Sequence, residues 1–289
     1  MNSDYVVDGV SKNLLEEDWD CLIILDACRF DFFERQYRNY FSGEVKRAIS
    51  SATETIEWLN IVFPNYYDDI VYVSANPYVN SRVETSNKKY GLVFDGKKHF
   101  HKVLDVWDWG WDDSLTSIRP ETVSKAFLDV KDKYPRKRFV LHYIQPHKPY
   151  IGSVYSKFIV GRSFADVYRG PDKRFSISLK IFLADLIRDW FGFEMLLRFK
   201  KFIHSSTLCQ TERIGMFEGM AGVRKAYSEN LNLVLDEVSK VVERMEGNVL
   251  ITADHGEYLG ENRLYGHGQY PRKPPISDVP WLEIRQNRV

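Results

Sequence analysis

Near-continuous apolar runs alternate with amphipathic stretches along this chain, and that alternation predicts the fold. Five runs favour buried strands: CLIILD (21–26), DIVYVSA (69–75), RFVLHYI (138–144), NVLITAD (248–254) and VPWLEI (279–284). The first four are apolar almost throughout, as strands covered on both faces are. Apolar residues at helical spacing occupy segments between these runs, at 30–40, 53–63, 121–133 and 223–246.

Strand and helix in alternation predict a doubly wound α/β fold with a mostly parallel central sheet flanked by helices. The stretch 152–220 breaks the alternation, and we expect it to form a helical insertion within a single domain covering 1–289. Such excursions commonly carry substrate-selecting surfaces. Within the insertion, the amphipathic stretch 177–203 favours a helix pair packed on the domain, with peripheral contact to a membrane as the alternative.

Composition limits the classes of partner and compartment. Lysine plus arginine and aspartate plus glutamate each number 40, so the net charge is zero and no nucleic-acid ligand is expected. Three cysteines do not read as a disulfide framework, and the first residues lack the pattern of a signal peptide. No apolar run is long enough to span a membrane. We therefore expect a cytoplasmic protein.

Metal-ligating side chains follow two of the expected strands. The run NVLIT leads directly into Asp254 and His255, and the first strand ends at Asp26. Helix capping is the simpler role for Asp26 taken alone. Two carboxylates and an imidazole at the carboxyl edge of one sheet nevertheless suit a divalent transition metal. Glu257 is expected to orient this site from behind the ligands.

Hydroxyl side chains crowd the start of the helix expected over 53–63. They are Ser50, Ser51, Thr53 and Thr55. One hydroxyl suffices to cap a helix. The alternative role is that of a nucleophile, because the N–H groups and the dipole of a helix N-terminus favour an anionic substrate.

Histidines and tryptophans supply further candidates. His142 falls within a strand, where a hydrogen-bonded core residue is the better interpretation, whereas His147 lies beyond the strand and within reach of a substrate. His267 precedes the last strand and is placed to fold back over the same edge. The tryptophans of VWDWGWDD (106–113) are expected to pack in the core, with stacking on a leaving group as the alternative.

In their order along the chain, five blocks resemble the sulfatase-like branch of the alkaline phosphatase superfamily. The blocks are LIILDACRFD, ATETIEWLNIVF, HYIQPHKPY, ITADHGEYLGE, and GHGQYP followed by VPWLEI. The resemblance implies a metal-dependent hydrolase or transferase of phosphate esters that forms a covalent phosphothreonine. The substrates it implies are small-molecule or glycan- or lipid-linked phosphate or sulfate esters.

The resemblance also implies the metal ligands and the nucleophile. Asp26, Thr55, Asp254 and His255 would bind the metal ion. Thr55 would attack the substrate, because the family places its nucleophile at the very start of a helix and the apolar helical pattern begins one residue later. Thr53 is the second choice.

The remaining matched positions would contact the substrate. His147 and His267 would hold its anionic group or protonate the leaving oxygen, and they would be the ligands of any second metal ion. After the second strand, where sulfatases tend to carry a lysine and a histidine, this chain departs from the pattern with SANPYVNS (74–81), and Asn76 would line the pocket instead. Arg29 would contact the substrate, with a structural ion pair to a nearby acid as an equal alternative.

Departures from the family pattern narrow the chemistry. Sulfatases form formylglycine at a Cys-x-Pro-x-Arg motif, but the nucleophile position here holds threonine, and CQTER (209–213) lacks the proline. His255 replaces the amide ligand of a calcium sulfatase, which favours manganese or zinc over calcium or magnesium. A phosphate ester is therefore the expected substrate. A sulfatase, or a non-catalytic metal-holding protein that binds a phosphorylated or glycan partner, is the alternative.

Overall fold

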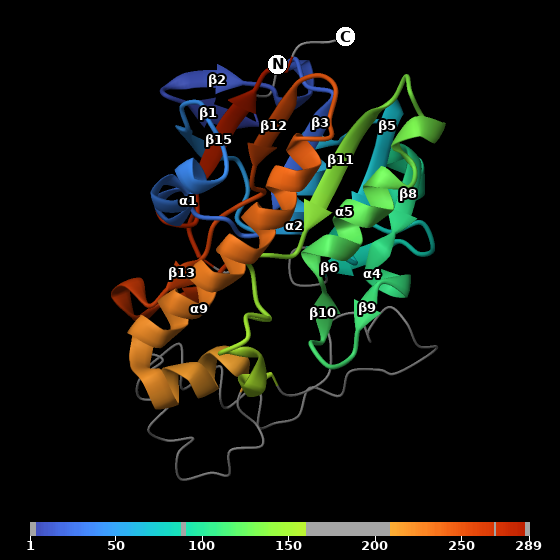
Figure 1. The fold of residues 1–289 in the computed structure, drawn as a ribbon. Helices are drawn as coiled ribbons and strands as arrows, with labels where there is room; N and C mark the ends of the chain where they lie inside the picture. Colours follow the sequence, from blue (N-terminus) through green and yellow to red (C-terminus); the bar gives the residue numbers. More distant parts are fainter. Residues whose placement is uncertain (1–3, 88–90, 160–208, 269, 287–289) are drawn as a thin grey trace.

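A nine-stranded sheet runs through the computed structural model, which describes residues 4–87, 91–159, 209–268 and 270–286 (Figure 1). β12, β3, β11, β5 and β8 are mutually parallel neighbours, and β15, β4, β1 and β2 extend the sheet in antiparallel pairs. In spatial order the strands are β2 (Val10–Lys12), β1 (Tyr5–Val7), β4 (Lys46–Ser50), β15 (Asp278–Ile284), β12 (Val249–Thr252), β3 (Cys21–Leu25), β11 (Arg138–Tyr143), β5 (Tyr67–Ser74) and β8 (Phe100–Asp105).

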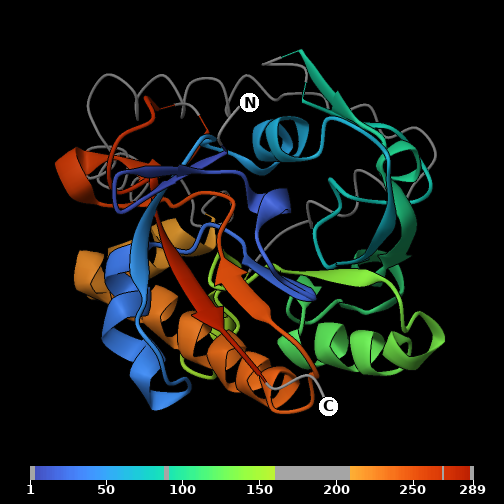
Figure 2. The same cartoon turned by 90° about the horizontal axis from the view of Figure 1, so that it is seen from above.

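Helices lie on both sides of this sheet. They are α1 (Phe30–Gln36), α2 (Thr55–Val62), α3 (Gly96–His99), α4 (Val106–Trp109), α5 (Pro120–Leu128) and α9 (Gln210–Val242). Figure 2 shows α1, α5 and α9 along one face and α2 on the opposite face. A mixed α/β fold with a large central sheet, as the sequence predicts, is thus confirmed.

Short elements complete the described chain. Three two-stranded sheets pair β10 (Ser117–Ile118) with β9 (Trp111–Asp112), β13 (Tyr258–Leu259) with β14 (Tyr265–Gly266), and β6 (Thr85–Asn87) with β7 (Leu92–Phe94). Single turns of 3-10 helix are η1 (Leu14–Glu16), η2 (Tyr37–Asn39), η3 (Lys131–Lys133), η4 (Ser156–Phe158) and η6 (Glu261–Arg263). The helices expected at 30–40 and 121–133 each end in such a turn, η2 and η3.

The structure corrects two of the expected elements. The strand VPWLEI, β15, is antiparallel to β12, so the sheet is parallel only from β12 to β8. The helix expected from residue 223 begins at Gln210, inside the expected insertion, with a non-helical Gly219 (φ 66°) at a kink. Most of the insertion, including the whole of 177–203, lies outside the described residues.

Buried side chains on both faces of the sheet hold these layers together. β3 is buried at all five positions, and Trp58 of α2, Tyr72 of β5 and Trp281 of β15 are almost fully buried. Burial of large aromatic and branched side chains is the main favourable term in such a core. Within the described ranges, no helix is long and apolar enough to cross a membrane.

Candidate active site

Adjacent strands of the sheet end in register, which brings separate parts of the chain together. Leu25 of β3 pairs with Tyr143 of β11, and Ile24 pairs with Thr252 of β12. The chain then leaves each strand through a polar residue, and the ends of β11 and β12 face the lower part of Figure 1. Asp26, Asn76 and Asp254, which follow β3, β5 and β12, are consequently buried at one edge.

Thr55 lies at the first position of α2, over this edge. Its hydroxyl donates a hydrogen bond of 2.7 Å to Asp254 Oδ2 and lies 3.4 Å from Asn76 Nδ2. The same amide nitrogen donates to Asp26 Oδ2 at 2.8 Å. Asn76 therefore links the nucleophile predicted from the sequence to one of the predicted metal ligands.

Thr53 has a different environment. Its backbone N–H and its hydroxyl both bond to Glu57 Oε2, at 2.8 and 3.2 Å. These bonds hold Thr53, which precedes α2 by two residues, on the carboxylate of Glu57 in the first turn of that helix. The geometry thus separates the two threonines that the sequence leaves as alternatives.

Backbone groups hold the Asp254 carboxylate in place. Oδ1 accepts from the N–H of Ala27 at 3.1 Å and from that of His255 at 2.9 Å. Ala27 has a positive φ of 56°, a conformation that non-glycine residues rarely adopt, and Tyr227 steadies this turn. The Tyr227 hydroxyl donates to Ala27 O at 2.8 Å and accepts from Arg29 N at 2.9 Å.

Donor atoms suited to one metal ion converge here. One ligand atom from each of Asp26, His142 and Asp254 lies within 4.8 Å of the other two, and His255 Nε2 is 3.4 Å from Asp254 Oδ2. Two donors bound to one zinc ion at about 2.1 Å are at most about 4.2 Å apart, so the spacing suits an ion after small movements. Nε2 of His142 and Nε2 of His255 are buried without a hydrogen-bond partner among the described residues.

His142 is the donor that the sequence analysis assigns to the core. It is fully buried, and its Nδ1 is 2.8 Å from the Tyr72 hydroxyl, as a core histidine would be. Its Nε2, however, has no hydrogen-bond partner among the described residues, and one of its ring nitrogens lies within 4.8 Å of an oxygen of each of the two carboxylates. The signal that would have identified it is its place near the end of β11, the neighbour of β3, whose end carries Asp26.

Two buried carboxylates so close together are a further sign of a cation. Burial, together with the negative charges of Asp254 and Glu257, raises the pKa of Asp26 well above its usual range. Burial also acts to raise the pKa of Asp254, but His255, His142 and the hydrogen bonds from Thr55 and Ala27 outweigh it and lower that pKa. A divalent cation would allow both carboxylates to ionise.

The two predicted substrate histidines meet above the donor cluster. His147 Nε2 is 3.2 Å from His267 Nε2, and the rings of His255 and His267 have centroids 4.2 Å apart. Burial and neighbouring positive groups lower the pKa of His147 to about 3 and place that of His267 well below its usual value. Both imidazoles are therefore neutral at pH 7, when an N–H group is available to donate to an oxyanion.

Arg29 does not reach this cluster. Its guanidinium is buried between two acids, with Nε 2.9 Å from Asp31 Oδ1 and Nη1 2.8 Å from Glu261 Oε1. Nη1 also donates to the carbonyl of Glu257 at 3.3 Å. The guanidinium thus forms the structural ion pairs that the sequence leaves as the alternative role of Arg29, and a contact of Arg29 with substrate stays a prediction.

Glu257 lies behind the cluster. It is buried, its Oε1 has no partner among the described residues, and its backbone carbonyl is held by Arg29. Burial raises the pKa of Glu257 to about 7, against the opposing charges of Lys148 and Arg29. Its carboxyl group is near enough to Asp26 to raise the pKa of that residue as well.

A cavity of about 390 Å³ opens directly above these groups. Asp26, Thr55 and Asn76 form part of its lining, His147, Lys148 and His267 a second part, and a largely apolar wall the rest. That wall consists of Ala75, Pro77, Tyr78, Trp111, Thr116, Ser117, Ile144, Pro149, Ile159, Cys209 and Gln210. Of the tryptophans in VWDWGWDD, Trp107 packs in the core and Trp109 is exposed, whereas Trp111 reaches the cavity.

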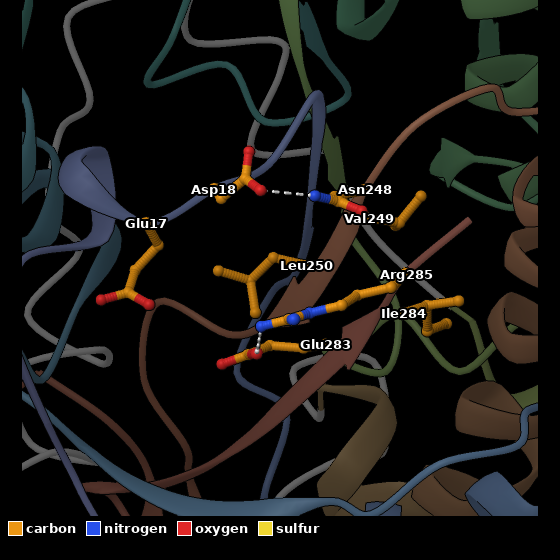
Figure 3. Close-up of a pocket in the computed structure, with 8 residues that line it drawn as sticks. All are labelled: Glu17, Asp18, Asn248, Val249, Leu250, Glu283, Ile284 and Arg285. Atoms are coloured by element: carbon orange, nitrogen blue, oxygen red, sulfur yellow. Dashed lines mark hydrogen bonds and ion pairs between the residues drawn. The ribbon is translucent and has the colours of Figure 1, made fainter. Parts of the chain in front are cut away.

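A smaller depression of about 70 Å³ lies at the opposite end of β12 (Figure 3). Among its lining residues, Asp18 accepts from Asn248 at 2.8 Å and Arg285 lies 3.9 Å from Glu283. The described lining contains no histidine, cysteine or hydroxyl side chain. The chemistry-bearing residues are therefore gathered at the carboxyl edge.

Comparison with known proteins identifies the fold. No protein-family model matches the sequence, and no curated protein matches it. Among solved structures, the integral membrane protein lipooligosaccharide phosphoethanolamine transferase A from Neisseria meningitidis is similar over 93% of this chain and 47% of its own, with 14% identity and a TM-score of 0.50. The chain has the fold of the alkaline phosphatase superfamily. It spans about half the length of that transferase.

Two further structures are similar over most of the chain. The C-terminal periplasmic domain of EcEptC from Escherichia coli, in complex with Zn, covers 99% of this chain and 76% of its own at 10% identity, with a TM-score of 0.47. A phosphonate monoester hydrolase from Agrobacterium radiobacter is similar over 91% of this chain and 67% of its own chain, with 12% identity and a TM-score of 0.48.

The cytoplasmic location predicted from the sequence is wrong. The similar structures include a periplasmic domain and an integral membrane protein. The prediction relied on the sparse cysteines, of which Cys21 and Cys28 are free and buried. A chain with a core of this size needs no disulfide for stability, so free buried thiols do not mark a reducing compartment.

Proposed function

We propose that this protein is a metal-dependent hydrolase or transferase of phosphate esters, with Thr55 as its nucleophile. The observation that carries the proposal is the 2.7 Å hydrogen bond from the Thr55 hydroxyl to Asp254, at the floor of a cavity and beside a cluster of metal-ligating side chains. A hydroxyl at a helix N-terminus faces N–H groups that favour an anionic substrate.

The metal ion would be held by Asp26, Asp254, His255 and Thr55, with His142 as a further donor. When bound, such an ion lowers the pKa of a coordinated hydroxyl and neutralises charge on the transferred group. Mixed nitrogen and oxygen donors favour zinc or manganese over calcium or magnesium. The zinc complex of EcEptC agrees with this choice. One ion is expected, and a second would use His147 and His267.

The reaction would proceed through side chains of this chain. Thr55 Oγ1 passes its proton towards Asp254 and attacks phosphorus in line, so that a bond to Thr55 forms as the bond to the leaving oxygen breaks. The N–H groups of the neutral His147 and His267 would donate to the non-bridging oxygens. Water or an acceptor alcohol then attacks the phosphothreonine and releases Thr55.

The nature of the acceptor distinguishes a hydrolase from a transferase. Lipooligosaccharide phosphoethanolamine transferase A is named for transfer to a lipid-linked glycan, and the Agrobacterium enzyme for hydrolysis of phosphonate monoesters. Small-molecule, glycan-linked and lipid-linked esters are therefore all candidate substrates. A sulfatase remains the second hypothesis, although a threonine at the nucleophile position favours phosphate.

Loss of activity in a matched pair of variants tests the proposal. Wild type, Thr55→Ala and Thr53→Ala would be loaded with zinc or manganese and assayed on an aryl phosphate monoester and an aryl phosphodiester. We expect turnover by wild type and Thr53→Ala and a loss of at least about 10³-fold in Thr55→Ala. Equal activity in all three proteins would remove Thr55 as nucleophile. Inactivity of the metal-loaded wild type on every ester would favour a non-catalytic binding protein.

A further inference from the structure

Lys148 belongs to a backbone segment that hydrogen bonds from α9 hold in place. Asn230, a fully buried residue of α9, donates through Nδ2 to the carbonyls of Pro149 at 2.9 Å and His147 at 3.1 Å. Its Oδ1 accepts from the N–H of Ile151 at 2.8 Å. A single asparagine thus holds the segment on both sides of Lys148.

Two further contacts tie the same segment to the sheet edge and to the start of α9. The backbone N–H of His147 donates to the carbonyl of Asp26 at 3.2 Å. Gln210 Oε1 accepts from Tyr150 N at 2.7 Å, and its Nε2 donates to Tyr150 O at 2.7 Å. The exposed side chain of Lys148 therefore projects from an anchored backbone, which limits the conformational entropy lost on contact with a ligand.

Lys148 is exposed and lines the cavity with His147 and His267. Among the described residues, no carboxylate lies within ion-pair distance of its ammonium group, and Glu257 feels its charge only from farther away. It is the single lysine or arginine in the described lining. Arg29, the other nearby cation, is already paired with Asp31 and Glu261. Among the residues that the structure describes, Lys148 is thus the cation that remains available to a ligand in the cavity.

A count of charges shows why the cavity needs this cation. The carboxylates of Asp26 and Asp254 would balance the charge of one divalent ion, and Lys148 is the one lysine or arginine that lines the described part of the cavity. Without Lys148, the described residues around such an ion would therefore offer an anionic ester no net positive charge. An added ammonium group would attract the ester and orient it.

We propose that Lys148 is a substrate-binding residue whose ammonium group pairs with a non-bridging oxygen of the ester. This inference rests on the proposed function, since it concerns the substrate of the same site. Lys148 holds the anionic group on the side of the cavity formed by His147 and takes no part in bond breaking. Removal of its charge therefore weakens binding more than turnover at saturation.

Kinetics of Lys148→Met, Lys148→Arg and the matched control Lys157→Met test this inference. Lys157 is exposed on η4, in the same stretch of chain, and does not line the cavity. With an aryl phosphate monoester and an aryl phosphodiester, we expect Lys148→Met to lower kcat/KM by about 10-fold to 100-fold, chiefly through KM. The loss should be larger for the doubly charged monoester, and added salt should reduce it. Lys148→Arg should recover most of the activity, and Lys157→Met should match wild type.

Binding of inorganic phosphate to the zinc-loaded proteins provides a second readout that needs no turnover. Calorimetry should show that zinc-loaded Lys148→Met binds inorganic phosphate at least about 10-fold more weakly than wild type does. The melting temperatures of the two proteins should be equal. If kcat/KM and phosphate affinity of Lys148→Met are within twofold of the wild-type values, the proposed role of Lys148 is overturned. Loss of activity in Thr55→Ala would in that case still support the proposed function. If wild type turns over neither ester, the proposed function fails, and the phosphate affinities alone decide whether Lys148 binds the anion.

Discussion

Thr55 and Asp254 are 199 residues apart in sequence, and a hydrogen bond of 2.7 Å joins Thr55 Oγ1 to Asp254 Oδ2. The bond exists because α2 starts directly over the end of β12, and Ala27 and His255 fix the other oxygen of the same carboxylate. A carboxylate held in this way is positioned to accept the hydroxyl proton of Thr55. This relationship carries the assignment of the nucleophile.

Asn76 should be needed for the geometry of this pair. In Asn76→Leu, Asp26 and Thr55 both lose the amide N–H that lies between them. We expect kcat/KM on an aryl phosphate to fall by about 10-fold to 100-fold, because removing one preorganised hydrogen-bond donor at an active site has effects of at least this order. Circular dichroism should show an unchanged fold. Full activity in this variant would mean that Asp26 and Thr55 are positioned by other contacts.

His142 should contribute to metal affinity although the sequence pattern places it in the core. A histidine that binds metal through Nε2 donates its other ring N–H, and the Tyr72 hydroxyl is 2.8 Å from Nδ1. We expect His142→Gln to weaken zinc binding by at least about 10-fold, and Tyr72→Phe to weaken it by a smaller factor. Competition with a chromophoric chelator measures both values without an activity assay. Unchanged zinc affinity in His142→Gln would restore the core interpretation.

Much of this site follows from the order of strands and polar residues. Apolar runs that end in Asp26 and Asp254 predict a shared edge, because parallel strands direct their carboxyl ends to the same side of a sheet. The predicted strands therefore locate the carboxylates correctly. The sequence does not distinguish Thr53 from Thr55, because that difference depends on whether Glu57 folds back over the helix start.

Other features were not readable from local pattern. β1 and β4 are short strands with partly exposed positions, and they join the sheet only through β15. Arg29 has the same local sequence whether it faces a substrate or an acid, and its partner Glu261 is more than two hundred residues away. Side-chain roles that depend on such long-range contacts require the structure.

Asp4 should make the stability of the protein depend on pH. Burial raises the pKa of Asp4 to about 6, against the hydrogen bond from Leu14 N, so the folded protein holds a proton that the unfolded chain releases near pH 4. Stability from this group is present below pH 4 and is lost as the pH rises towards 6. At pH 8, Asp4→Asn should therefore increase the free energy of unfolding by about 1–3 kcal/mol.

Urea unfolding of wild type and Asp4→Asn at pH 4 and pH 8 measures this difference. The stabilising effect of the substitution should grow between the two pH values, since asparagine does not titrate. An effect of the same size at both pH values would show that Asp4 titrates normally in the folded protein.

Asn230 should be a stability determinant as well as a support for the cavity wall. Asn230→Leu leaves the carbonyls of His147 and Pro149 without their donor and buries an apolar group among them. We expect the free energy of unfolding to fall by about 1–3 kcal/mol, the range for unsatisfied buried polar groups. Asn232→Ala, on a half-exposed position of the same helix, serves as the control and should cost less. Equal effects of the two substitutions would argue that the hydrogen bonds from Asn230 to the carbonyls of His147 and Pro149 do not stabilise the fold.

Direct detection of the covalent intermediate tests the central claim. Zinc- or manganese-loaded wild type, Thr53→Ala and Thr55→Ala would be mixed with an aryl phosphate ester, quenched in acid during turnover, digested and analysed by mass spectrometry. The account predicts a phosphorylated peptide with the modification on Thr55 in wild type and Thr53→Ala, and no modified peptide in Thr55→Ala. Modification of Thr53, or turnover by wild type without any adduct on Thr55, would contradict it.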